Sequence, residues 1–213
     1  MPTLTNMEKV NGIVISGASA PTDRHILLGT QTASSSATLS FSGLNSHRSD
    51  VLRSSFDELE FRFMNMHPAT DDKDFMFQVN AAGASGFNET ITSAVTRAYH
   101  EEDESGGDTP TLHYASNPDQ AQGTAYQTIG MDGVGNDNDQ STSGILTLYA
   151  PSSTTYVKHF TSTGNGIHAS NYSITLHVAG YINTTAAIDE ISFKFESGNI
   201  DAGVIKMYGI AKA

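Results

Sequence analysis

The chain has 213 residues, of which 38% are hydrophobic and only 16% are charged, and Ser, Thr, Asn and Gly fill much of the remainder. This composition suits one large folded domain and favours strands and tight turns over helices. The formal charge of −12 repels phosphate backbones and anionic membranes, so a nucleic-acid partner is not expected. The chain has no cysteine, which excludes disulfides and agrees with assembly in a reducing cytoplasm.

Residues 1–24 show less regular alternation than the rest of the sequence, and we expect them to form an N-terminal arm or outer strand. A single β-sandwich domain is expected over residues 25–213. The N-terminal residues have no basic start and no continuous apolar core, so they do not resemble a signal peptide. The longest apolar runs are far shorter than the ~18 residues of a membrane span, so no membrane insertion is expected.

Short segments that alternate apolar and polar residues occupy most of the chain after this arm. The segment LEFRFMN places Phe61 and Phe63 on one face, and DFMFQVN, which follows a turn at Pro68, does the same with Phe75 and Phe77. A short helical turn capped by Asp50 is a weaker possibility before the first of these segments. About ten such strands, with no helical pattern between them, predict an all-β fold: an antiparallel β-sandwich of jelly-roll-like type.

The later segments continue the same pattern. They are ETITSAVTRAYH, TLHYA, GILTLYA, TTYVKHFTS, NYSITLHVAGYI, DEISFKFE and GVIKMYGIA. Phe193 and Phe195 are predicted to join the four earlier phenylalanines in the core. Because ESGNIDAG joins the last two segments, we expect a β-hairpin with Tyr208 and Ile210 near its end.

One Gly-rich acidic loop offers a candidate metal site. Asp132, Asp137 and Asp139 supply the oxygen ligands that calcium prefers. The loop lacks the spacing and the terminal Glu of an EF-hand, however, and a solvated turn explains it better. No cofactor is therefore expected, with calcium as the open exception.

A second acidic loop, residues 101–108, offers carboxylates but little geometry. Glu101, Asp103 and Glu104 could be imagined as a glycosidase pair, because that chemistry needs two carboxylates at a set separation. A run of acids in one loop is more often simply solvated. No nucleotide-binding motif and no nucleophile elbow is present, so no catalytic residue is assigned.

Aromatic and histidine side chains are the remaining candidates for binding. No histidine stands two or four residues from another, and His159 and His177 are expected to be ordinary side chains on strand faces. Exposed tyrosines could form a platform for sugars, although the absence of Trp weakens that interpretation. The candidates are Tyr99, Tyr114, Tyr126, Tyr149, Tyr156 and Tyr172.

An ordered series of segments carries a resemblance to a known group of proteins. The series is LLGTQTASSSATLSFSGL, FDELEFRFMNMHPATDDKDFMFQVN, TRAYHEEDES, PSSTTYVKHFTSTGN and GYINTTAAIDEISFKFESGNIDAGVIKMYGIAKA. From about Leu28 onward, the chain resembles small β-rich virion proteins of marine bacteriophages, especially cyanophages. The resemblance implies a jelly-roll-like sandwich in a tail, appendage or capsid-surface protein, and it carries no catalytic residues.

The sequence therefore predicts a non-enzymatic bacteriophage structural protein, assembled in the host cytoplasm and displayed on the exterior of the particle. It would be either associated with the tail or an appendage, or a decoration of the capsid. The expected partners are further copies of the chain, a trimer before other states, and other virion proteins, with a host surface glycan as a further candidate. The alternative is a carbohydrate-binding module or a polysaccharide-degrading jelly-roll enzyme.

Overall fold

The computed structural model describes residues 7–10, 13–16, 25–44, 56–103 and 110–211. Within these residues the regular secondary structure consists of strands alone, and every pairing between strands is antiparallel. The helical turn expected at Asp50 lies outside the described residues. The all-β prediction from the sequence is confirmed.

The strands follow one another at short intervals along the chain. They are β1 (Met7–Val10), β2 (Ile13–Ser16), β3 (His25–Thr32), β4 (Leu39–Ser42), β5 (Phe56–Pro68), β6 (Phe75–Ala81), β7 (Ile91–Glu101), β8 (Thr111–Tyr114), β9 (Ala121–Gly123), β10 (Gln127–Thr128), β11 (Thr142–Tyr149), β12 (Lys158–Ile167), β13 (Tyr172–Ile182), β14 (Ile188–Phe195) and β15 (Ile200–Ala211).

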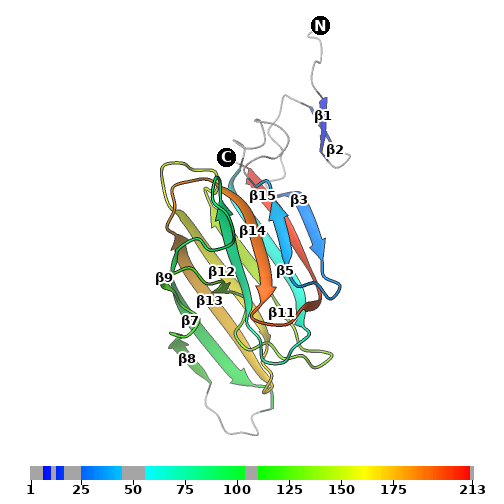
Figure 1. The fold of residues 1–213 in the computed structure, drawn as a ribbon. Coiled ribbons are helices and arrows are strands. Elements are labelled where there is room, and N and C mark those ends of the chain that lie inside the picture. Colours follow the sequence, from blue (N-terminus) through cyan, green and yellow to red (C-terminus); the bar gives the residue numbers. More distant parts are fainter. Residues whose placement is uncertain (1–6, 11–12, 17–24, 45–55, 104–109, 212–213) are drawn as a thin grey trace.

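Two sheets of unequal size form the sandwich (Figure 1). The large sheet has nine strands in the order β3-β15-β5-β11-β12-β13-β7-β8, with β9 also paired to β7. The small sheet has four strands in the order β10-β6-β14-β4, and β1 and β2 pair with each other in a separate two-stranded sheet. Because the large sheet has more than twice as many strands as the small one, the small sheet cannot cover all of its inner face.

The chain alternates between the two sheets along much of its length. β3, β5 and β7 belong to the large sheet, whereas β4 and β6 between them belong to the small sheet. This alternation agrees with the jelly-roll-like sandwich that the sequence predicted. The predicted hairpin of the last two segments is wrong, because β14 lies in the small sheet and β15 lies between β3 and β5 in the large one. The short connection between them crosses the sandwich instead of turning back within one sheet.

Phenylalanine side chains from both sheets meet in the core. Phe63 of β5 packs against Phe75 of β6 with ring centroids 5.3 Å apart, and Phe61 packs against Phe193 of β14 at 5.5 Å. All six phenylalanines predicted to be buried are at most 1% exposed. The alternation read from LEFRFMN and DFMFQVN therefore gave the correct inward faces, since successive strand residues point to opposite sides of a sheet.

Candidate binding surface

The outward face of five neighbouring strands in the large sheet forms a broad, regular surface. Along β12, buried and exposed residues alternate strictly from Lys158 to Gly166, so every second side chain points away from the core. The strand registers align these outward residues in rows across β11, β12, β13, β7 and β8. One row runs through Ile145, Thr163, His177, Thr96 and Tyr114.

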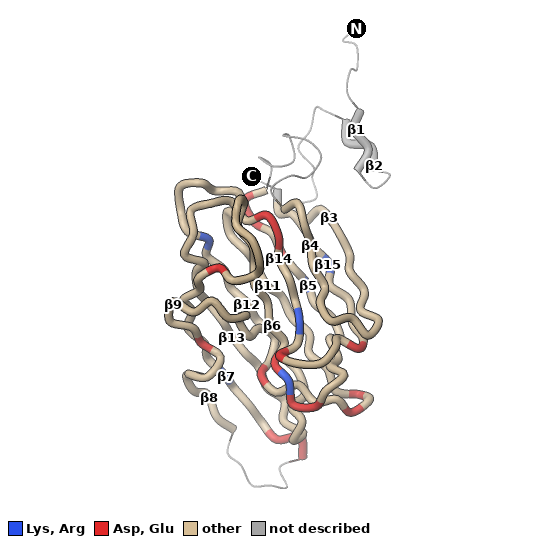
Figure 2. The backbone as a smooth tube through the Cα atoms, in the orientation of Figure 1, with Lys and Arg blue, Asp and Glu red and all other residues tan. Residues whose placement is uncertain are grey.

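The neighbouring rows have the same short, uncharged character. One row contains Ser143, Asn165, Thr175, Ala98 and Leu112. The next contains Thr147, Thr161, Ala179 and Ala94. We refer to the outward side chains of these five strands as the neutral face, because they include no Asp, Glu, Lys or Arg. Figure 2 shows how few charged residues occur along β12 and β13.

The next strand of the sheet has charged side chains on its outward face. On β5, which pairs with β11, the outward positions include Glu60 and Arg62, and the Arg62 Nε donates to the Glu60 carboxylate at 2.5 Å. Beyond β5, the guanidinium of Arg62 lies 5.0 Å from the ring centroid of Tyr208 on β15. The neutral face therefore ends at a definite boundary between β11 and β5.

Hydrogen bonds between neighbouring strands order the polar side chains of the neutral face. The Asn165 amide nitrogen donates to the hydroxyls of Ser173 and Thr175, both at 3.1 Å. Thr163 Oγ1 lies 3.0 Å from His177 Nδ1. Such cross-strand pairs hold short side chains in place, so a partner that binds here meets a surface that is already organised.

Large apolar side chains lie at both sides of the neutral face. Leu112 on β8 is 74% exposed, Tyr114 on the same strand is 55% exposed, and Ile145 on β11 is 39% exposed. Among the described residues, only Leu27 and Tyr156 join them as exposed large hydrophobic residues. Leu112 and Tyr114 lie close together on β8, as is typical of interaction sites, whereas Ile145 lies four strands away on β11.

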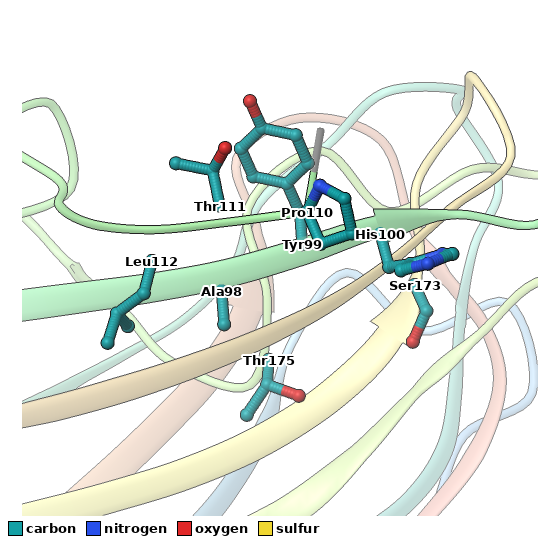
Figure 3. A pocket seen from close by; sticks show the side chains of 8 residues that line it. All are labelled: Ala98, Tyr99, His100, Pro110, Thr111, Leu112, Ser173 and Thr175. Atoms are coloured by element: carbon teal, nitrogen blue, oxygen red, sulfur yellow. The ribbon is translucent and has the colours of Figure 1, made fainter. Parts of the chain in front are cut away.

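A shallow hollow of roughly 410 Å³ lies at the β8 side of the neutral face. Its lining comprises Ala98, Tyr99, His100, Pro110, Thr111, Leu112, Ser173 and Thr175 (Figure 3). Ala98, Leu112 and Thr175 supply apolar surface, and His100 and Ser173 supply polar groups. The hollow can therefore accept a small group that is apolar on one side and bears hydroxyls on the other.

The three predicted calcium ligands are not gathered at one point. The Arg97 guanidinium pairs with the Asp132 carboxylate, whereas Asp137 and Asp139 are exposed at the other end of the loop. Within the part of the chain that the structure describes, no group of three or more His, Cys, Asp or Glu residues could hold a metal ion. Calcium binding at this loop stays a prediction.

The first half of this loop is packed in the core, which the sequence did not reveal. Met131 and Val134 are fully buried, as is the preceding Ile129, so the expectation of a solvated turn is wrong for residues 131–135. The segment fits because Gly164 presents no side chain where the main chain of Gly130 passes over the inner face of β12. Only residues 136–139 are exposed as expected.

Side chains of the chain itself fix the loop in place. Asp74 accepts hydrogen bonds from the Gly133 amide at 2.9 Å and from the Thr128 hydroxyl at 3.0 Å. Burial raises the pKa of the Asp74 carboxyl, and these two hydrogen bonds oppose that shift. Asp71 accepts a further hydrogen bond from the Asn136 amide at 3.0 Å.

The acids considered for glycosidase chemistry lie at the end of β7. Glu101 accepts a hydrogen bond from the Tyr172 hydroxyl at 3.2 Å, and Asp103 is exposed just beyond the strand. Glu104 and the remainder of this loop to residue 109 lie outside the described residues. The described contact assigns Glu101 a role in joining β7 to β13.

The six candidate tyrosines do not form one platform. Tyr99 and Tyr172 pack edge to face with centroids 5.9 Å apart, and the Lys194 ammonium lies 4.8 Å from the ring centroid of Tyr126. Tyr156 is 72% exposed in the connection before β12. Only Tyr114 and Tyr149 belong to the neutral face.

Tyr181, which sequence reasoning did not select, also lies on the neutral face. Its ring packs against His159 with centroids 6.1 Å apart. Both His159 and His177 are exposed on strand faces, as expected. The strict alternation of NYSITLHVAGYI was the signal that could have placed Tyr181 with them.

Lys158 is a buried cation that the sequence gave no reason to expect. Its ammonium donates to the carbonyls of Tyr156 at 2.8 Å and Thr184 at 3.2 Å, on the inner side of β12. The side chain has no exposed surface, and the resulting desolvation lowers its pKa. The neutral face therefore owes part of its neutrality to a lysine that points inward.

Comparison of the chain with protein-family models, with curated proteins and with solved structures gave no match. Over the described residues, no helix has the length and apolar character needed to cross a membrane.

Proposed function

We propose that this protein is a non-enzymatic structural component of a bacteriophage particle, displayed on the exterior and acting by assembly and surface binding. The observation that carries the proposal is the neutral face, a broad and ordered sheet surface on a chain with a net charge of −12. A flat, uncharged surface with exposed apolar side chains suits contact between proteins. The resemblance of the sequence to virion proteins of marine bacteriophages is the reason for proposing a bacteriophage particle.

The contacts of the candidate acids support binding without turnover. Asp132 is paired with Arg97, and Glu101 accepts from Tyr172, so each takes part in a contact between segments of the fold. General acid–base chemistry instead needs such groups within reach of a bound substrate. We propose a homo-oligomer, a trimer before other states, in which residues 1–24 contact a neighbouring copy or the particle.

Immunoelectron microscopy of purified particles tests this function. A labelled antibody against the protein should decorate the outside of intact particles, and its position should distinguish the tail or an appendage from the capsid. Absence of the protein from purified particles, measured by mass spectrometry, would refute a structural role in the virion.

A carbohydrate-binding module is the second candidate, because the hollow next to Leu112 combines apolar and polar lining. Stacking on apolar surface together with a few hydrogen bonds is the usual arrangement in small-ligand sites. If this candidate is correct, host envelope polysaccharide should bind the wild type and bind Leu112→Ala at least several-fold more weakly.

The reaction products distinguish a polysaccharide-degrading enzyme from a structural protein and from a carbohydrate-binding module. Purified protein incubated with the polysaccharide should leave the chain length unchanged. Shortened chains that disappear in Glu101→Gln or Asp103→Asn would contradict a non-enzymatic function.

A further inference from the structure

We propose that the neutral face is a two-fold contact with a second copy of this chain. The inference rests on the proposed role in assembly and adds the surface and the symmetry of one contact. The axis runs along β13, and the two large sheets pack face to face. This contact is separate from the trimer contacts proposed for residues 1–24.

Charge selects the second copy as the occupant. Two molecules that each carry −12 repel one another, and contact between most parts of their surfaces would bring carboxylates together. On the neutral face, the outward side chains of five neighbouring strands include no Asp, Glu, Lys or Arg. It is therefore a surface on which two copies can meet without placing like charges in contact.

The strand order makes the face self-complementary. β13 is the middle strand of the five, with β11 two strands away on one side and β8 two strands away on the other. A two-fold axis along β13 therefore places β11 of one copy opposite β8 of the other. Ile145 on β11 and Tyr114 on β8 lie in the same row, so each exposed apolar residue meets the other at both ends of the contact.

One row at the centre of the contact consists of small side chains. Ala179 on β13 lies between Thr161 on β12 and Ala94 on β7 in one row, and all three are exposed. Short side chains let two sheets approach to the usual separation of about 10 Å. His177 and Tyr181 flank this row along β13, and Ile145, Leu112 and Tyr114 toward the sides would fill the space between twisted sheets.

The size of the face sets the expected strength of the contact. Five strands spaced about 4.8 Å apart, each with about eight residues rising ~3.3 Å, give a footprint of roughly 20 Å by 25 Å. Stable interfaces bury about 800 Å² on each partner, so this footprint of roughly 500 Å² falls below that class and among weak, transient contacts. We expect an association that depends on protein concentration.

Sedimentation of a charge variant tests the contact. Ala179→Glu places two carboxylates near each other across the proposed axis, so its dissociation constant should rise at least tenfold over that of the full-length wild type. The matched control is Ser40→Glu, which adds the same charge at an exposed position of β4 in the small sheet. It should associate like the wild type, and circular dichroism should show that both variants are folded.

The salt dependence of the dissociation constant distinguishes the proposed contact from an interface held by ion pairs. The proposed contact has no ion pairs, so added salt screens only the repulsion between the two acidic molecules. Wild-type association should therefore tighten as salt is raised. Weakening with salt would overturn the proposal.

Cross-linking tests the axis directly, because the chain has no cysteine of its own. Sheets about 10 Å apart hold the two cysteines beyond the reach of a disulfide. A short bifunctional thiol reagent should instead link Ala179→Cys into a dimer, since the same residue of both copies lies next to the axis. Ser40→Cys should remain uncross-linked under the same conditions.

The outcomes separate this inference from the proposed function. A trimer whose mass is unchanged by Ala179→Glu, with no Ala179→Cys dimer, would overturn the two-fold contact and leave an assembling structural protein intact. A monomer that also is missing from purified particles would overturn both. A monomer that binds polysaccharide through the neutral face would overturn the contact in favour of the carbohydrate-binding candidate.

Discussion

Asp74 is a partly buried carboxyl that holds the connection between β10 and β11 in place at an energetic cost. It accepts from Gly133 and Thr128, which fixes residues 129–135 against the core. Because burial raises its pKa above the ordinary 3.8, the folded state binds a proton more tightly than the unfolded state. The contribution of this group to stability is therefore greatest below pH 3.8 and declines as the pH rises through the folded pKa.

Asp74→Asn should relieve this cost without removing the contacts. The Asn oxygen can accept from the Gly133 amide, and the Asn nitrogen can donate to the Thr128 hydroxyl. We expect the free energy of unfolding of the variant, relative to wild type, to increase from pH 4 to pH 7 in urea titrations. Asp74→Ala, which removes both acceptors, should be less stable than wild type at both pH values. A constant difference between Asp74→Asn and wild type would contradict the raised pKa.

Burial shifts the pKa of Lys158 in the opposite direction to that of Asp74. Its pKa is lowered from 10.5 by burial, so the cost of burying the charged form is present below the folded pKa and is relieved as the pH rises toward 10.5. Lys158→Met keeps the length of the side chain and does not titrate. The stability of wild type relative to this variant should therefore increase between pH 7 and pH 10.5, measured by chemical denaturation. A decrease over that range would show that the charged amine is the favoured form in the fold.

At the scale of the strands, glycines on inner faces decide where the core admits another segment. A Cβ added at Gly164 would collide with the main chain of Gly130, which cannot move aside as a flexible side chain can. At Gly29 on β3, a Cβ would instead meet the ring of Phe41 at 3.3 Å. The same substitution therefore has different consequences on two strands of one sheet.

Gly164→Ala should destabilise the protein by about 1 to 3 kcal/mol, the usual cost of overpacking. Gly29→Ala should cost less, because the Phe41 ring can shift by a few tenths of an ångström. Thermal unfolding of the two variants side by side measures the difference. Equal melting temperatures would show that residues 129–135 are not packed against β12.

The Arg97–Asp132 pair joins β7 to the same connection. Both side chains are partly buried, with 29% and 17% exposed, so removing one partner leaves the other in a poorly solvated place. We expect Arg97→Met to cost about 1 to 3 kcal/mol, between the values typical of exposed and buried ion pairs. In a double-mutant cycle, Arg97→Met/Asp132→Asn should cost less than the sum of the single variants. Additive costs would indicate that the pair contributes nothing as a pair.

The sequence predicted the strands and their inward faces because alternation is a local property. Phe61, Phe63, Phe75 and Phe77 lie where their period of two places them. It did not predict that β14 and β15 lie in different sheets, because a short connection can either turn back or cross a sandwich. The neutral face was missed for a related reason: its residues are neighbours only through the registers of five strands, and no single segment shows that the charges are elsewhere.

At the scale of the whole molecule, the position of β15 links one end of the described chain to the other. β15 pairs with β3 on one side and β5 on the other. It therefore lies between two strands that come much earlier in the sequence. Until β15 is in place, β3 has no pairing to the rest of the large sheet, and one edge of β5 is open.

This arrangement has a consequence during synthesis on the ribosome. A nascent chain that has not yet released residues 200–211 from the exit tunnel cannot complete its large sheet, so folding should be late and largely post-translational. Pulse proteolysis of stalled nascent chains should find residues 25–32 cleavable until residues 200–211 emerge, and protected soon afterwards. Protection that arises while those residues are still inside the tunnel would show that the early strands find another partner first.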